Sequence, residues 1–279
     1  MSLKYLITAP AALALVCTLT AAPAHAAAIR ATAEFTDFTL LGNDDGSTGL
    51  VNIGFSINFF GVNRSQLFVN NNGNITLDAA LGTFTPFNLS TTNRQIIAPF
   101  FADVDTRPAV VPDVQYGTGI VDGRAAFGVN WIDVGYFANQ VANRNSFQLI
   151  MIDRSDVAAG DFDFEFNYDS ITWETGQASG GDANGLGGSS ARAGWSNGAT
   201  ADFELAGSAI NGAFLNGGPN ALISNSLNSN VAGRYVFSVR NGNVVPPTPS
   251  VPEPASLILM GAALLGTGLA RRRRTSSQR

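Results

Sequence analysis

An eight-residue stretch of alternating polar and aromatic side chains constrains the fold of this chain most strongly. Residues 161–168 read Asp-Phe-Asp-Phe-Glu-Phe-Asn-Tyr. Successive side chains of a β-strand point to opposite faces, so this period of two predicts a strand with one aromatic face. That face should pack in a core through Phe162, Phe164, Phe166 and Tyr168. The acidic side chains between them are expected on a face in contact with solvent.

Further strand and turn signals fill residues 27–243, where no window shows sustained helical periodicity. Asn70-Asn-Asn-Gly-Asn74 lies between two short apolar runs and predicts a hairpin, because Asn and Gly tolerate the positive φ of tight turns. The Gly- and Ser-rich stretch 179–190 is expected to be a long exposed loop. Other strands are expected at residues 125–134, 146–153 and 234–240. The fold class we predict is all-β, as a single antiparallel β-sandwich-like domain over residues 27–243.

The first 26 residues are typical of a secretory signal peptide. A lysine near the start precedes the mostly apolar run 6–19, and Ala24 and Ala26 fit a signal peptidase site. The alternative is an N-terminal membrane anchor, which the short apolar run disfavours. Cleavage after residue 26 would remove the only Cys and the only His, Cys17 and His25. The mature chain would then have no Cys or His nucleophile and no His/Cys zinc site.

A second segment typical of a targeting signal occupies residues 252–274. The triplet Pro252, Glu253, Pro254 precedes the uncharged run 255–270, and four arginines follow: Arg271, Arg272, Arg273 and Arg274. As a transmembrane helix, residues 255–270 would span about 24 Å, against about 30 Å of hydrocarbon in a bilayer. The arginines should stay cytoplasmic together with a tail at residues 275–279, which places the domain outside the inner membrane. The alternative is a permanent tail anchor. Residues 244–251, with three prolines, are expected to form a stiff spacer.

The segment between these two predicted targeting sequences is strongly acidic. Residues 27–250 contain 10 Arg, no Lys and 20 Asp or Glu. Such a surface is not attracted to nucleic acid, and it resists binding to anionic polysaccharide unless divalent cations bridge the two. Nucleic acid is therefore not expected as a partner.

Acidic residues beside turns give the weak candidates for a metal site. Asp103 and Asp105 could ligate Ca²⁺, but a strand end that binds turn backbone or Arg107 explains them more simply. The run Asn43-Asp-Asp-Gly46 predicts a turn, because it lacks the ligand spacing of an EF-hand. No cofactor and no metal are assigned from the sequence.

Two further groups have a functional and a structural interpretation. The acidic face formed by Asp161, Asp163 and Glu165 could bind Ca²⁺ or act as a general acid and base, but a solvated strand surface explains it more simply. Aromatic rings could form a platform for sugars, but at strand positions they are expected in the core; these are Trp131, Trp173 and Trp195. No catalytic residue is predicted.

The C-terminal segment resembles a known family. Val251-Pro-Glu-Pro-Ala-Ser, the run Gly261-Ala-Ala-Leu-Leu-Gly-Thr-Gly-Leu-Ala and the arginines resemble the PEP-CTERM sorting signal of Gram-negative bacteria. The resemblance implies recognition of residues 252–254 by an exosortase and transient anchoring in the inner membrane. Cleavage near the triplet would follow, with delivery to the cell surface or to an exopolysaccharide matrix such as that of a biofilm.

Residues 50–240 resemble a second family, the nidogen-like domain. The resemblance is carried by Phe59-Phe-Gly61, Leu67-Phe-Val-Asn-Asn-Asn-Gly-Asn74, Ile97-Ala-Pro-Phe-Phe-Ala-Asp-Val-Asp-Thr-Arg107 and Asn145-Ser-Phe-Gln148. Phe101 stands where the family usually has Trp. Nidogen-like domains occur in matrix and adhesion proteins, so the family implies a binding role without catalytic residues to transfer.

These observations predict an exported, non-enzymatic surface or matrix protein whose partner is exopolysaccharide or another surface protein. One alternative is a secreted glycan-active enzyme that uses only carboxylates, for which two carboxyl groups must face one cleft. Another is a purely structural module stiffened by Ca²⁺.

Overall fold

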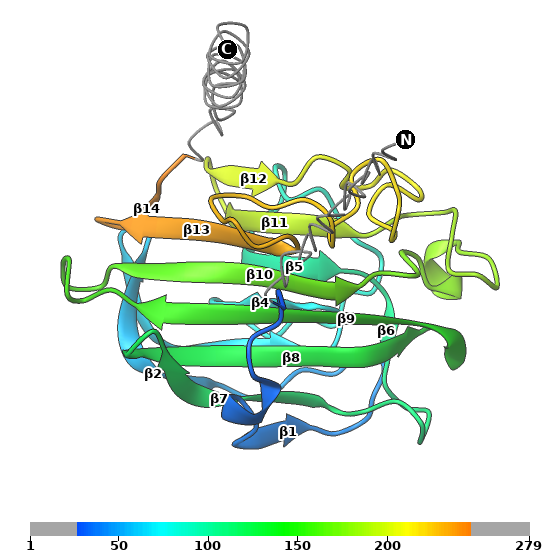
Figure 1. Cartoon of the computed structure of the whole chain (residues 1–279), viewed down its shortest axis with the longest axis horizontal. Coiled ribbons are helices and arrows are strands. Elements are labelled where there is room, and N and C mark those ends of the chain that lie inside the picture. Colours follow the sequence, from blue (N-terminus) through cyan, green and yellow to red (C-terminus); the bar gives the residue numbers. More distant parts are fainter. Residues whose placement is uncertain (1–26, 247–279) are drawn as a thin grey trace, which may run out of the picture.

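The structure is a computed structural model that describes residues 27–246. Two antiparallel β-sheets face each other in an arrangement consistent with a β-sandwich (Figure 1). No α-helix occurs in this part of the chain, only the short 3₁₀ turns η1 (Thr32–Glu34) and η2 (Gln177–Ser179). None of its helices could cross a membrane. The segments expected to be the signal peptide and the sorting signal lie outside the described residues.

The larger sheet has eight strands. Its order is β1 (Phe38–Leu40), β7 (Val114–Val121), β8 (Arg124–Tyr136), β9 (Gln140–Asp153), β10 (Phe162–Ser170), β13 (Arg234–Arg240) and β14 (Asn243–Val244), and β6 (Val104–Asp105) pairs with the end of β8. The strands predicted at residues 125–134, 146–153 and 234–240 are confirmed as parts of β8, β9 and β13. The sheet continues to Val244, which pairs with Val239.

The smaller sheet has six strands. Its order is β12 (Asp202–Glu204), β11 (Arg192–Asn197), β5 (Gln95–Phe101), β4 (Asn74–Thr76), β3 (Val62–Asn70) and β2 (Val51–Phe59). The predicted hairpin is the β3–β4 connection, in which Asn70 pairs with Asn74. Gly73 has φ +69° there, and a Cβ at this position would lie 1.8 Å from the carbonyl oxygen of Phe100. Only glycine therefore fits this turn.

The main core lies between the sheets and is rich in aromatic residues. The aromatic face predicted for β10 is confirmed, because all four of its rings are buried. Trp131 and Trp173 are also fully buried, and their indole N–H groups donate to the carbonyls of Asn71 (3.0 Å) and Val134 (3.1 Å). Trp195 is buried as well. The three tryptophans therefore belong to the core and do not form an exposed sugar platform.

The expectation that the second face of β10 meets solvent is wrong. Glu165 is only 3% exposed because the segment before η1 lies over it, and Arg30 binds its carboxylate. Phe35, which follows η1, fills an apolar cluster on the same side of the larger sheet, formed with Val121, Ala126, Ile150 and Ile152. The N-terminal segment of the domain thus covers an outer sheet face that the period-two pattern assigns to water.

Candidate functional site

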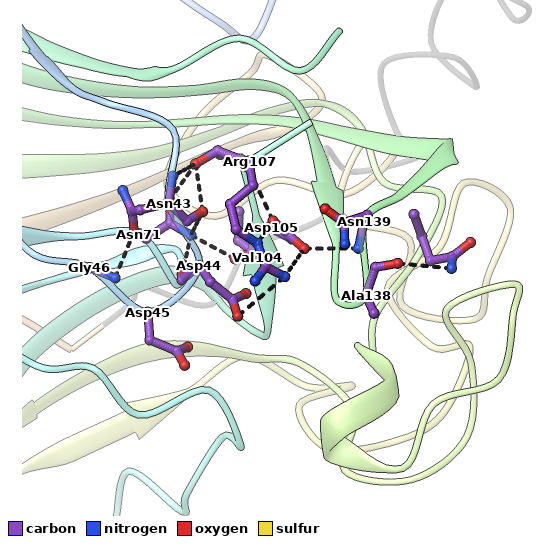
Figure 2. A network of polar contacts seen from close by, with 12 residues as sticks. Asn43, Asp44, Asp45, Gly46, Asn71, Val104, Asp105, Arg107, Ala138 and Asn139 are labelled. Atoms are coloured by element: carbon purple, nitrogen blue, oxygen red, sulfur yellow. Dashed lines mark hydrogen bonds and ion pairs between the residues drawn. The ribbon is translucent and has the colours of Figure 1, made fainter. Parts of the chain in front are cut away.

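Three connecting segments meet where β5 ends. They are the 43–47 loop between β1 and β2, the 70–74 turn between β3 and β4, and the 102–107 segment that contains β6 (Figure 2). Backbone hydrogen bonds join them, since Thr106 N donates to the Asn43 carbonyl and Asn71 N donates to the Gly46 carbonyl, both at 2.9 Å. We call the carboxylates gathered here, Asp44, Asp45 and Asp103, the acidic cluster.

Asn71 is the central residue of this junction. Its side-chain amide donates to the backbone carbonyls of Asp44 and Val104 (Figure 2). Its side-chain oxygen accepts a hydrogen bond from the Thr106 hydroxyl at 3.0 Å. The side chain is fully buried. One amide from the hairpin turn therefore fixes the position of the other two segments, because buried backbone carbonyls need donors.

The carboxylate of Asp105 is fully paired with neighbouring donors. Arg107 donates to it from Nε (2.9 Å), Nη2 (2.6 Å) and its backbone N (3.1 Å), and Asn139 N adds a fourth bond at 2.8 Å. Burial would raise the pKa of Asp105, but these donors outweigh it and hold the pKa below its usual value. Asp105 is thus a strand-end residue that is paired with Arg107, and it takes no part in the acidic cluster.

Asp103 is in the opposite situation. It is 1% exposed, and no residue in the described part of the chain donates a hydrogen bond to its Oδ2 atom. Burial and the charges of Asp44, Asp45 and Asp105 raise the pKa of Asp103 to about 7. Burial likewise raises the pKa of Asp44 to about 6, with a further contribution from the Asp105 charge. Both pKa shifts are those of carboxylates whose negative charge is not fully balanced by hydrogen-bond donors or cations.

The acidic cluster is compact. One carboxylate oxygen from each of Asp44, Asp45 and Asp103 lies within 4.8 Å of the other two. Arg107 reaches only its edge, with Nη2 3.4 Å from Asp44 Oδ2, and the Asp45 side chain lies apart from the Asp105–Arg107 network (Figure 2). Of the two residues predicted as weak Ca²⁺ candidates, only Asp103 belongs to this cluster.

Two neighbouring residues, Asn72 and Gly176, help to fix the positions of the carboxylates in the acidic cluster. Asn72 donates from its side-chain amide to Asp45 Oδ1 at 2.8 Å and accepts from Val104 N at 2.8 Å. Gly176 packs directly on Asp103, because a Cβ at that position would lie 2.3 Å from Asp103 Oδ2. The position of the Asp103 carboxylate therefore depends on a glycine from a distant loop.

The acidic face of β10 does not contribute a second site. Arg154 and Arg240 each bind Asp163 at 2.7 Å, and Asp161 accepts a hydrogen bond from Asn241 N. Five surface pockets of the described part are each lined by no more than one Asp or Glu. None of these pockets has the facing pair of carboxylates that a glycosidase requires.

The sequence interpretation missed Asp44 and Asp45 as partners of Asp103. The run Asn43-Asp-Asp-Gly46 does form a turn, in which Gly46 N donates to Asn43 Oδ1 at 2.6 Å, so the local interpretation is correct. The sequence offered one signal for the cluster: two pairs of acidic residues, Asp44 with Asp45 and Asp103 with Asp105, each lie beside a predicted turn or strand end. Nothing in that signal shows that residues almost 60 positions apart meet in space.

Comparisons with known proteins agree with both resemblances found in the sequence. Residues 65–241 match the family model of the nidogen-like domain, and residues 250–274 match that of the PEP-CTERM protein-sorting motif. Human alpha-tectorin is 32% identical over 228 residues, which cover 73% of this chain and 10% of alpha-tectorin. The chicken protein is 29% identical over 246 residues, or 79% of this chain and 11% of that relative.

The chain therefore spans about a tenth of the length of the relatives that it matches. No solved structure matches it. Because the family model covers most of the described domain, the chain belongs to the nidogen-like domain family and carries a PEP-CTERM sorting motif after that domain.

Proposed function

We propose that this chain is an exported bacterial surface or matrix protein that acts by binding and not by catalysis. The observation that carries the proposal is the occurrence of a nidogen-like domain and a PEP-CTERM motif in one chain. In this account a signal peptidase cuts after residue 26, and the run 255–270 holds the protein in the inner membrane. An exosortase then recognises Pro252, Glu253 and Pro254 and releases the domain to the cell surface.

The proposed partner is neutral exopolysaccharide or another surface protein. Nine of the ten arginines in residues 27–246 form ion pairs with carboxylates, which leaves little free positive charge to attract a polyanion; these are Arg30, Arg94, Arg107, Arg124, Arg144, Arg154, Arg192, Arg234 and Arg240. Adhesion of this acidic domain to a neutral or weakly charged partner fits this distribution.

The test of sorting is fractionation of cells that produce the wild-type chain or the Pro252→Ala/Pro254→Ala variant, with and without the exosortase. The wild type should reach the surface only when the exosortase is present, and the variant should stay in the inner membrane in both cases. Substitution of Pro246 and Pro247 by Ala is the matched control, because it removes two prolines outside the triplet. Surface display of the triplet variant at wild-type level would contradict the proposal.

The test of binding uses exopolysaccharide purified from the producing organism. The released protein should sediment with the polysaccharide. The mixture should contain no new reducing ends, which would show that the protein binds the polysaccharide without hydrolysing it. A steady release of reducing ends by the purified protein would instead favour the glycan-active enzyme.

A further inference from the structure

We propose that Asp44, Asp45 and Asp103 bind one Ca²⁺ ion. The geometry fits, because one oxygen from each carboxylate lies within 4.8 Å of the others. Protein oxygens bind Ca²⁺ at about 2.3–2.6 Å, so two ligands of one ion can be at most about 5.2 Å apart. A single ion placed between the three oxygens can therefore be reached by all of them after a small adjustment of the side chains.

A second observation points to a ligand at this place. Asp103 is 1% exposed and its Oδ2 atom has no donor among the described residues, while one oxygen of the same carboxylate belongs to this three-carboxylate group. Asp44 Oδ1 is buried and unpaired as well. Buried carboxylate oxygens are almost always satisfied by donors or cations, since their desolvation otherwise costs several kcal/mol. The neighbouring Asp105 carboxylate, by contrast, has four donors.

The donor atoms select the class of ion. Residues 27–246 contain neither His nor Cys, so every side-chain ligand available here is an oxygen, which hard cations prefer. Ca²⁺ accepts irregular sets of six to eight oxygens, whereas Mg²⁺ demands near-octahedral geometry and keeps its water. Because Asp44 and Asp45 are partly exposed, water can fill the remaining positions around Ca²⁺.

The charges of the junction also call for a cation. Among residues 27–246, Arg107 is the one cation paired with the carboxylates of this junction, Asp44, Asp45, Asp103 and Asp105, so the formal charge of the junction is −3. A bound Ca²⁺ would reduce this charge to −1. It would also join the 43–47 loop to the 102–107 segment, so that the ion ties together two of the three segments that meet after β5.

The test uses the full chain in mild detergent, stripped of metal with a chelator and then titrated with CaCl₂ alone. Calorimetry should give one Ca²⁺ per chain, with half-saturation on the order of 0.1–1 mM as in other extracellular modules. At tenfold excess over half-saturation, the Tm should rise by about 3–6 °C. MgCl₂ at the same concentration should give a smaller rise.

Variants separate this site from other acidic surfaces. Asp103→Asn and Asp45→Asn keep the side-chain shape, and each should raise the half-saturating Ca²⁺ concentration by at least about tenfold. Asp45 is partly exposed, so Asp45→Asn provides the test if Asp103→Asn does not fold. Asp202→Asn, on the exposed start of β12, makes the same charge change elsewhere and should leave the response unchanged. No Ca²⁺ response in the wild type, or an unchanged response in Asp45→Asn, would overturn the proposal.

Discussion

Arg30 donates two hydrogen bonds to the carboxylate of Glu165, from Nε at 2.7 Å and from Nη2 at 2.8 Å. The two residues are 135 positions apart, and both side chains are largely buried. The pair fastens the first residues of the domain across the outer face of β10. Removal of the arginine would leave a buried carboxylate whose next cation, Arg234 Nε, is 3.8 Å away.

Arg30→Gln should therefore lower the free energy of unfolding by about 1–3 kcal/mol, because Glu165 loses its charge-assisted bonds in a buried position. Urea denaturation of wild type and variant measures the change. Arg64→Gln is the matched control, since Arg64 forms no ion pair within residues 27–246 and bonds only Gln95, and it should cost less than about 1 kcal/mol. Equal losses in both variants would show that the pair has no special role.

Asp103 and Asp105 should respond oppositely to the same substitution in the chelated protein. Asp105→Asn removes the negative charge and one of the two oxygens that accept three bonds from Arg107, and it should lower the free energy of unfolding by about 2 kcal/mol. Asp103→Asn removes an uncompensated buried charge and should raise it. Chemical denaturation in excess chelator measures both. A loss of similar size in the two variants would contradict the environments described for them.

Gly176→Ala should weaken both the fold and the Ca²⁺ response, because the new methyl group would lie 2.3 Å from Asp103 Oδ2. Overpacking of this kind costs about 1–3 kcal/mol. Gly49→Ala provides the control, since nothing lies within 4 Å of the Cβ that it adds. Thermal denaturation with and without Ca²⁺ compares them. If Gly176→Ala behaves like Gly49→Ala in both conditions, the packing described for Asp103 is wrong.

Asp156 gives a prediction for acid conditions. Hydrogen bonds from Arg124 and Arg154 lower the pKa of Asp156 to about 2 in the folded protein, below the ordinary value of 3.8. A carboxyl with a depressed folded pKa adds stability that is present above the unfolded pKa and is lost as the pH falls through the folded one. The wild type should thus be more stable than Asp156→Asn above about pH 4, and the difference should vanish near pH 2.

Stability measured between pH 2 and pH 6 checks this, and added salt should shrink the difference because Asp156 is exposed. Asp202→Asn, which removes an exposed carboxylate outside this network, should show no such dependence. A difference between wild type and Asp156→Asn that grows towards pH 2 would contradict the assignment.

Local patterns in the sequence were sufficient for much of the fold. The alternation in residues 161–168 located β10 and its buried aromatic face, and the run Asn70–Asn74 located the β3–β4 hairpin. Both depend on period and turn chemistry, which neighbouring residues determine. The order of strands in the two sheets depends on long-range pairing, and no local pattern encodes it.

The parts that the sequence did not reveal all involve contacts between distant segments. The acidic face of β10 has the alternation of a solvated surface, yet Arg30 covers Glu165. Asp44 has the setting of a simple turn residue, yet the hairpin turn places it beside Asp103 through Asn71. In both cases the charge pattern was visible, but the partner was fixed by tertiary packing.

The most direct test of the account is the intact mass of the native protein recovered from the cell surface. Processing by a signal peptidase and an exosortase predicts a chain that begins at Ala27 and lacks the apolar run and the four arginines after the Pro-Glu-Pro triplet. A surface protein whose mass still includes residues 255–279 would contradict the account, and so would recovery of the protein only from the cytosol.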